Sequence, residues 1–162
     1  MSIRAESLAD AHSLDRFDCG DEGLNQWLQR EAIPAEQRGV RTYVVVDDAR
    51  EVVGYCAVAP HLVERDGRTR VPHRIPAVLL ARLAVDRRSQ GQGLGSELLV
   101  WVLSLLVAAS RTAQAKVVVA GAIDDRAARF YEDHGFVPIA GNGRRLVQSI
   151  ASIAETLGLS AG

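Results

Sequence analysis

The spacing of apolar residues near the N-terminus predicts an amphipathic helix. Leu24, Leu28 and Ala32 recur at helical intervals, and Asp21 stands where an N-cap belongs. Pro34 is expected to break or restart this helix, because proline lacks an N–H and its ring clashes with the preceding turn.

Strands are predicted where β-branched residues run together. The segment "RTYVVVDDAREVVGYCAVAP" favours a hairpin with a polar turn at Asp47 to Arg50. "VLLARLAVD" is apolar on both faces, which is typical of a central strand. Further strands are expected near Ile3 to Ala5, in "KVVVAGAI", and twice in "FVPIAGNGRRLVQSI" around an Asn-Gly turn.

Later helices are predicted in "GSELLVWVLSLLVAAS", in "DDRAARFYEDHG" with Asp124 as cap and Gly135 as stop, and in the tail "SIAETLG". The resulting order is β-α-β-β-β-α-β-α-β-β. It indicates an α/β fold with a mixed, mostly antiparallel sheet flanked by helices. A length of 162 residues with 48% hydrophobic residues suits a single domain, residues 1–162, with its own core.

Charge and cysteine content exclude some classes of protein. The net charge of -1 excludes a uniformly basic nucleic-acid binder, although a local basic surface remains open. Cys19 and Cys56 lack metal-ligand spacing, so neither a zinc site, nor any other metal site, nor a disulfide framework is expected. "MSIRAESLAD" lacks the apolar region of a signal peptide, so we expect a cytoplasmic protein with free thiols.

The longest apolar run, Leu98 to Ala109, predicts a buried helix. At about 12 residues it falls short of the roughly 20 that span a bilayer, so no membrane association is expected. Between Glu97 and Ala109 only Ser104 is polar, whereas a helix on one face of a sheet usually keeps a polar stripe. Either a neighbouring element covers this helix or it forms a subunit interface, and we expect a homodimer.

The segment "HLVERDGRTRVPHRIPA" has no periodicity and predicts a long surface loop. Its arginines could bind an RNA backbone through phosphate contacts, or they could simply be a solvated loop. The candidate RNA-binding residues are Arg65, Arg68, Arg70 and Arg74.

The glycine-rich stretch "VDRRSQGQGLGSELL" is either a flexible turn or a phosphate-binding turn at the start of a helix. A P-loop needs Gly-Lys-Ser/Thr, and the chain has Gly-Leu-Gly-Ser. A dinucleotide fingerprint needs G-x-G-x-x-G directly after a strand, and here the spacing is G-x-G-x-G after a polar lead-in. Both common nucleotide motifs are therefore excluded.

The remaining pattern resembles the GNAT family of N-acetyltransferases. Gln90, Gly93 and Gly95 fit its Q/R-x-x-G-x-G/A signature, which leaves Gly91 the least constrained of the three glycines. "ARLAVD" precedes the turn at the family's distance, and "AARFYEDHGFVP" resembles its A-x-x-F-Y-x-x-x-G-F segment. The resemblance implies the GNAT fold and an acetyl-CoA-dependent N-acetyltransferase.

A closer resemblance is to the toxin branch of this family. It rests on "FDCGDEGLNQWL", "RTYVVVD", "VVGYCAVAP", "RLAVDRRSQGQGLG" and "FYEDHGFVP". This branch pairs with ribbon-helix-helix antitoxins and acetylates the amino group of aminoacyl-tRNA, which blocks translation. One departure is "IPAEQRGV", where that branch has an uninterrupted helix with an asparagine.

The resemblance also implies roles for particular residues. Tyr131 is the candidate general acid, because a phenol with a pKa of about 10 stays protonated at neutral pH and can give its proton to the leaving thiolate. A backbone N–H near Leu83 to Val85 would polarise the carbonyl. The candidate acetyl-CoA-binding residues are Leu83, Ala84, Val85, Arg87, Arg88, Gln90, Gly91, Gln92, Gly93, Leu94, Gly95, Ser96 and Phe130.

No side chain stands out as a general base. An α-amino group has a pKa near 8, so an aminoacyl α-amine is already substantially neutral at physiological pH. Two other functions stay open from sequence: acetylation of a small amine or a protein N-terminus, and non-catalytic binding of a ribbon-helix-helix repressor.

Overall fold

The computed structural model describes residues 3–64 and 74–159, and its strands are hydrogen-bonded in the order β1-β2-β3-β4-β5-β7-β6. β4 pairs with β5 in parallel, whereas β1–β2, β2–β3, β5–β7 and β6–β7 are antiparallel. The α/β fold with a mixed, mostly antiparallel sheet is therefore as predicted from the sequence. The strands are β1 (Ala5–Ser7), β2 (Arg41–Val46), β3 (Val52–Glu64), β4 (Arg74–Val85), β5 (Val117–Gly121), β6 (Val137–Ile139) and β7 (Asn142–Ser149). The helices are α1 (Glu22–Gln26), α2 (Ala32–Ala35), α3 (Leu94–Ala113), α4 (Asp125–Asp133) and α5 (Ile150–Leu157).

The described chain divides into two compact units, residues 1–58 with 82–102 and residues 59–81 with 103–162. The first unit contains the predicted hairpin: β2 and β3 pair from Arg41↔Val58 to Val46↔Val52. Its core is built where the first helical segment packs on these strands; it contains Leu8, Phe17, Leu24, Leu28, Ala32, Val44, Val46, Val52, Tyr55 and Ala84. The helical spacing read from sequence is therefore the core-facing side of that segment.

Pro34 does not break this helical segment, but an α-helix restarts just before it, which is the second of the two expected outcomes. It lies inside α2, and helical backbone continues from α1 through a π-helical turn, Trp27–Glu31, into α2. In this turn the Ala32 N–H donates to the Trp27 carbonyl, five residues back. A π turn widens the helix where hydrogen bonding is disturbed, and here it comes just before the proline. The irregularity is therefore real but begins several residues earlier than the sequence suggested.

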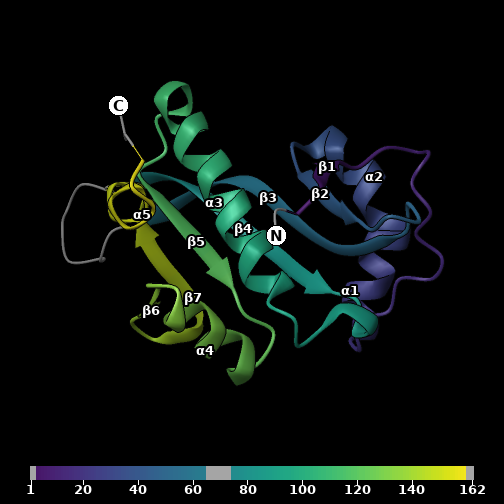
Figure 1. The fold of residues 1–162 in the computed structure, drawn as a ribbon. Coiled ribbons are helices and arrows are strands. Elements are labelled where there is room, and N and C mark those ends of the chain that lie inside the picture. Colours follow the sequence, from purple (N-terminus) through teal and green to yellow (C-terminus); the bar gives the residue numbers. More distant parts are fainter. Residues whose placement is uncertain (1–2, 65–73, 160–162) are drawn as a thin grey trace. The chain divides into compact units, whose positions relative to one another are not determined.

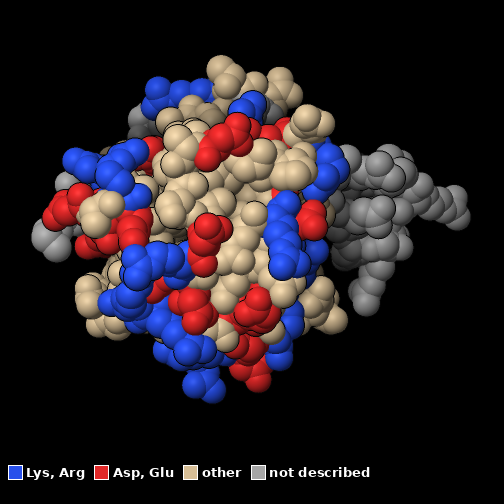
Figure 2. Space-filling view, turned by 90° about the vertical axis from the view of Figure 1, so that its right-hand side faces the viewer, with Lys and Arg blue, Asp and Glu red and all other residues tan. Residues whose placement is uncertain are grey.

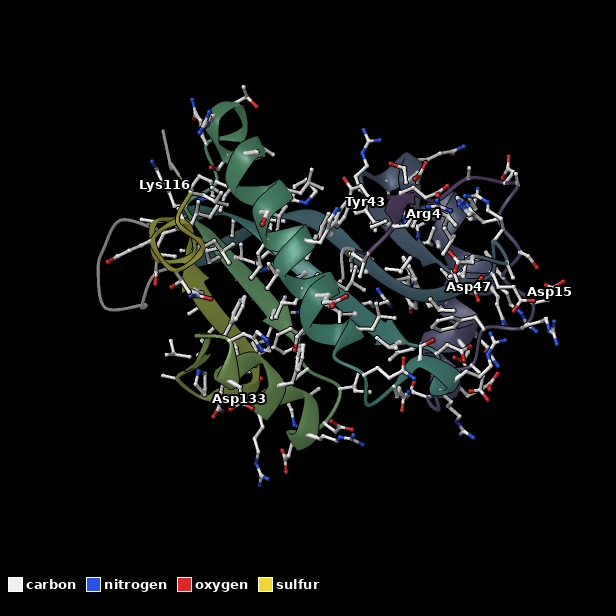
Figure 3. The ribbon with its side chains drawn as sticks, viewed as in Figure 1. Arg4, Asp15, Tyr43, Asp47, Lys116 and Asp133 are labelled. Carbon is white, nitrogen blue, oxygen red and sulfur yellow. The ribbon has the colours of Figure 1, made fainter. Side chains whose placement is uncertain are left out.

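The second unit is organised around β5. Strands β5, β7 and β6 run side by side in Figure 1, and β5 pairs with β7 from Val117↔Ser149 to Gly121↔Arg145. Lys116, labelled in Figure 3, joins two elements to the start of β5, because its N–H donates to the Pro76 carbonyl and its carbonyl accepts from the Ile150 N–H. α5 follows β7 directly, with the Ser149 side chain as its N-cap.

Two boundaries differ from the sequence prediction. The β6–β7 turn is Ala140-Gly141 rather than Asn142-Gly143, because Ile139 pairs with Asn142 and Gly141 has φ 80°. Glycine is favoured at this positive φ. Both ends of the expected long loop belong to strands, since β3 extends to Glu64 and β4 begins at Arg74, and residues 65–73 lie outside the described residues.

Helix α3 is longer than the apolar run within it. By length and composition alone, Leu94–Thr112 could cross a membrane, with a hydropathy of 1.5, but core helices pass the same test. Leu98, Leu99 and Val102 are fully buried, which makes one face of α3 part of the core. The prediction of a buried helix is confirmed for that face, whereas Val100 is 40% exposed.

Candidate active site

The glycine turn leads directly into the N-terminus of α3. The Glu97 N–H donates to the Gly93 carbonyl at 3.1 Å, which is the first i to i−4 bond of the helix. The N–H groups of Leu94, Gly95 and Ser96 therefore lie in the first turn, where a helix has no carbonyl to offer them. A helix N-terminus of this kind favours negative charge.

The backbone of the turn requires glycine at two positions. Gly91 has φ 77° and Gly93 has φ 81°, a region that residues with side chains rarely adopt. A Cβ added at either position would meet no described heavy atom within 4 Å, so neither glycine is required by packing within the described chain. Gly91 thus carries the same backbone demand as Gly93, although the signature leaves its position open.

These observations fit a pyrophosphate. The turn leads into N–H donors at a helix N-terminus, and the positions where side chains of residues 91 and 93 would lie are open among the described residues. Gly91, Gln92 and Gly93 are exposed, so a ligand can reach this backbone. A phosphate could therefore reach the turn from Gly91 to Ser96, and the contacts with these residues stay predictions.

Gln90 has a different place from the one its position in the signature suggested. Its Nε2 donates to the Val85 carbonyl at 2.8 Å and to the Cys19 carbonyl at 2.9 Å. The side-chain amide nitrogen therefore ties the start of the turn to the end of β4 and to the loop before α1. Sequence reasoning took Gln90 for a ligand contact and missed this structural role.

The residue after β4 is a buried carboxylate that sequence reasoning missed. Asp86 is 2% exposed and accepts hydrogen bonds from the N–H of Asp18 and from the N–H and guanidinium of Arg88. Burial alone would raise the pKa of Asp86, but these hydrogen bonds outweigh it and hold the pKa below its usual value. Arg88 also pairs with Glu51 at 3.0 Å. Its guanidinium is thus engaged by two carboxylates, whereas Arg87 meets Asp18 only at 3.8 Å.

We expect Asp86→Asn to lower the free energy of unfolding at pH 7 by about 1–3 kcal/mol, because a buried charge-assisted network loses its carboxylate. The pKa of Asp86 is lower in the folded than in the unfolded chain, where it is about 3.9. The stability it contributes is therefore present above that pH and is lost as the pH falls through the folded-state pKa. Urea unfolding at pH 7 and near pH 3 should show a smaller pH dependence in the variant. Parallel pH profiles would contradict this assignment.

The predicted residues on β4 lie at the end of that strand. Ala84 is buried in the core of the first unit, whereas Leu83 and Val85 are half-buried. The strand end is tied to β3 where the Asp86 N–H donates to the Val53 carbonyl at 2.8 Å.

Tyr131 lies on α4, in the second unit, and is 3% exposed. Its ring meets those of Phe130 and Phe136 edge-on, with centroids 5.4 and 5.7 Å apart. The Asp124 side chain caps the helix by accepting from the Ala127 N–H, as predicted. The local structure therefore fixes the tyrosine ring by packing on two neighbouring aromatic residues.

Helix α4 ends just before Gly135, whose backbone conformation favours glycine. We expect Gly135→Ala to lower the free energy of unfolding by about 1–3 kcal/mol. Gly135 has φ 92°, and a Cβ there would lie 2.7 Å from Nε2 of Gln148, which is 8% exposed. Chemical denaturation measures the loss. Adding Gln148→Ala should restore only part of the stability, since it removes the contact but not the backbone strain. If the double variant were as stable as the wild type, the positive φ at position 135 would contribute nothing to the loss of stability.

Among the described residues, the candidate RNA-binding arginines do not form a site. Arg65, Arg68 and Arg70 lie outside the described residues, and the backbone of Arg74 begins β4 rather than lying in a loop. Figure 2 shows basic and acidic side chains intermixed on one face of the molecule. Four ion pairs of the first unit illustrate this mixing: Arg16–Glu51, Arg50–Glu6, Arg88–Glu51 and Arg87–Asp18.

Comparison with known protein families decides the assignment. The model of the acetyltransferase (GNAT) domain matches residues 38–138, which include the glycine turn and Tyr131. The chain belongs to the GNAT acetyltransferase family. The fold and the acetyltransferase activity predicted from the glycine signature are thereby confirmed.

Related GNAT proteins include characterised toxins. The chain is 36% identical over 135 residues to a tRNA-acetylating toxin of Mycobacterium tuberculosis, covering 80% of this chain and 81% of that one. It also resembles a tyrosine-to-phenylalanine mutant of the AtaT toxin bound to acetyl-CoA and the C-terminus of the antitoxin AtaR, with TM-score 0.85, 30% identity and coverage of 97% and 99%. AtaT complexed with acetyl-methionyl-tRNAfMet matches with TM-score 0.84, 29% identity and coverage of 96% and 99%.

Membership of the GNAT family gives the glycine turn its ligand class. Acetyl-CoA carries a pyrophosphate, and the N–H donors in the first turn of α3 have the chemistry to bind one. The individual contacts assigned to Arg87, Arg88, Gln92 and Phe130 stay predictions.

Proposed function

We propose that this GNAT protein transfers the acetyl group of acetyl-CoA to the α-amino group of aminoacyl-tRNA and so blocks translation. The observation that carries the proposal is the 36% identity to a tRNA-acetylating toxin over 80% of the chain. The likeness to AtaT complexed with acetyl-methionyl-tRNAfMet supports it. The glycine turn at the start of α3 offers N–H groups that could bind the pyrophosphate of acetyl-CoA.

Acetyl-CoA supplies an activated acetyl thioester when it is bound. The N–H groups from Gly91 to Ser96 would hold its pyrophosphate, and the positive end of the α3 dipole would add to that attraction. Backbone N–H groups at the end of β4, near Leu83 to Val85, would hydrogen-bond the acetyl oxygen. These groups bind and orient without changing their own protonation.

Tyr131 holds the proton that the departing thiolate needs. Its phenol is held in place by the edge-on rings of Phe130 and Phe136, so the hydroxyl keeps a fixed position. The acceptor needs less help, because an α-amine with a pKa near 8 is substantially neutral at physiological pH. A lysine amine near 10.4 would need a base. This difference favours an aminoacyl acceptor over a lysine side chain.

The proposal includes a protein partner. The relative AtaT is bound to the antitoxin AtaR, so a ribbon-helix-helix antitoxin is the expected inhibitor of this chain as well. We also propose a cytoplasmic homodimer. The partly exposed face of α3, where Val100 is 40% exposed, is compatible with an interface.

The test is transfer of labelled acetyl from acetyl-CoA to purified aminoacyl-tRNA. We expect label in the RNA fraction and an aminoacyl bond that resists hydrolysis, with deacylated tRNA as the negative substrate. The polyamine spermidine and a peptide with a free N-terminus are tested in parallel. Label in either of these but not in aminoacyl-tRNA would contradict the proposed acceptor.

A further inference from the structure

The loop Asp18–Gly20 is bonded to the segment that leads from β4 into the glycine turn. The Arg87 N–H donates to the Asp18 carbonyl at 2.8 Å, and the Asp18 N–H donates to Oδ2 of Asp86 at 3.0 Å. Gln90 adds the bond from its Nε2 to the Cys19 carbonyl at 2.9 Å. Three hydrogen bonds therefore join a loop near the N-terminus to a segment some seventy residues later.

Asn25 holds the same loop from the opposite direction. It lies in α1, is 5% exposed, and uses both ends of its amide: Nδ2 donates to Oδ1 of Asp18 at 2.9 Å, and Oδ1 accepts from the Cys19 N–H at 2.8 Å. The Gly20 N–H donates to the same Asp18 oxygen. The hydrogen bond from Asn25 is the main reason that the pKa of Asp18 lies below its usual value. The loop is thus fixed by a buried side chain.

The loop also shapes the approach of Arg87. Gly20 has φ 97°, and a Cβ there would lie 3.3 Å from Nε of Arg87. The glycine therefore allows both the turn of the loop and the close passage of the arginine side chain.

The glycine turn needs such support. Gly91 and Gly93 remove the side chains that would restrict the backbone, and this freedom is lost when a ligand orders the turn. A binding loop whose ends are already fixed pays less of this cost, so it binds more tightly. At its C-terminal end the turn enters α3, and at its other end Gln90 is the residue that anchors it.

We propose that the Asp18–Gly20 loop holds the start of the acetyl-CoA-binding turn in place, and we call this loop the brace. Asn25 and Gln90 are positioning residues that act through it. This inference rests on acetyl-CoA binding at the turn. It gives a physical role to the block "FDCGDEGLNQWL", on which the resemblance to the toxin branch partly rests: this stretch supports the cofactor turn as well as the core.

The test compares Asn25→Leu, Gln90→Met and the double variant in the full-length chain. Calorimetric titration with coenzyme A should show Kd raised roughly fivefold to twentyfold by each single change, because each removes two hydrogen bonds that hold the loop or the start of the turn. The double variant should bind little worse than the weaker single variant, since both changes release the same loop. Gln26→Met is the matched control. Gln26 follows Asn25 in α1 but is exposed, and its Nε2 donates to Glu22, which is also exposed. The Kd of this variant for coenzyme A should equal that of the wild type.

A second measurement separates positioning from simple loss of stability. Without ligand, amide hydrogen exchange at Gly91–Ser96 should quicken in both variants relative to exchange in β5, which reports the second unit. Unchanged Kd with unchanged exchange at the turn would overturn the brace and leave the proposed function standing. Strictly additive losses in the double variant would also overturn it. A wild-type chain that binds no coenzyme A would overturn both.

Discussion

Gly93→Val is expected to weaken coenzyme A binding on the order of 100-fold or more, because a branched side chain would occupy the space in front of the N–H donors of the turn. Gly93 has φ 81°, and the space where its Cβ would lie is open to a ligand. A β-branched residue at this φ is also strained, so the free energy of unfolding should fall by about 1–3 kcal/mol. Titration calorimetry and urea unfolding measure the two effects.

Gly141→Val is the matched control for that strain. Gly141 has φ 80° and equally open surroundings among the described residues, but it lies in the β6–β7 turn. It should lose similar stability and keep its affinity for coenzyme A. Equal loss of affinity in both variants would show that strain, and not obstruction of a phosphate site, explains the result at Gly93.

The sequence predicted the fold because each element carries local signals that tertiary contacts reinforce. Asp21 and Asp124 are N-caps in the structure, and the polar turn at residues 47–50 separates β2 from β3; Asp47 is labelled there in Figure 3. A cap or a turn depends on neighbouring residues, so it can be read from a short stretch. Pro34 shows the limit, since the π turn that comes before it depends on how the whole segment packs.

The predicted position of the β6–β7 turn was wrong for a related reason. Two glycine-containing pairs follow one another, Ala140-Gly141 and Asn142-Gly143, and local preference favours the second. The register is set by pairing across the sheet, where Val137 meets Val147 and Pro138 meets Leu146. Long-range pairing therefore overrides the turn signal, and no local pattern reveals it.

The sequence located the glycine turn at the start of α3, whose ligand contacts stay predictions, but it did not reveal the residues that support the turn. Gly91 and Gly93 could be found because glycine at a turn has few alternative explanations. Asp86 and Asn25 could not, because their partners lie far away in the chain. The family resemblance implies that Arg88 binds acetyl-CoA, which stays a prediction, and the structure shows that Arg88 is also bonded to Asp86 and Glu51.

Tyr131→Phe is expected to lower kcat on the order of 10²- to 10⁴-fold, the range for loss of a positioned general acid. The aromatic ring remains, so its edge-on contacts with Phe130 and Phe136 should persist and the Kd for coenzyme A should change little. Single-turnover acetylation of aminoacyl-tRNA, together with calorimetric binding, separates the chemical step from affinity. Growth arrest on expression of the chain should disappear in parallel.

Tyr55→Phe tests whether any buried tyrosine hydroxyl would give this result. The Tyr55 hydroxyl donates to the Leu24 carbonyl at 2.8 Å, so its loss should cost about 1 kcal/mol of stability while kcat stays near wild type. A comparable fall in kcat for both variants would assign the effect to packing. A fall confined to Tyr131→Phe, with unchanged affinity, is the result expected of a proton-donating phenol, because each substitution removes a hydroxyl group from a ring that is at most 3% exposed.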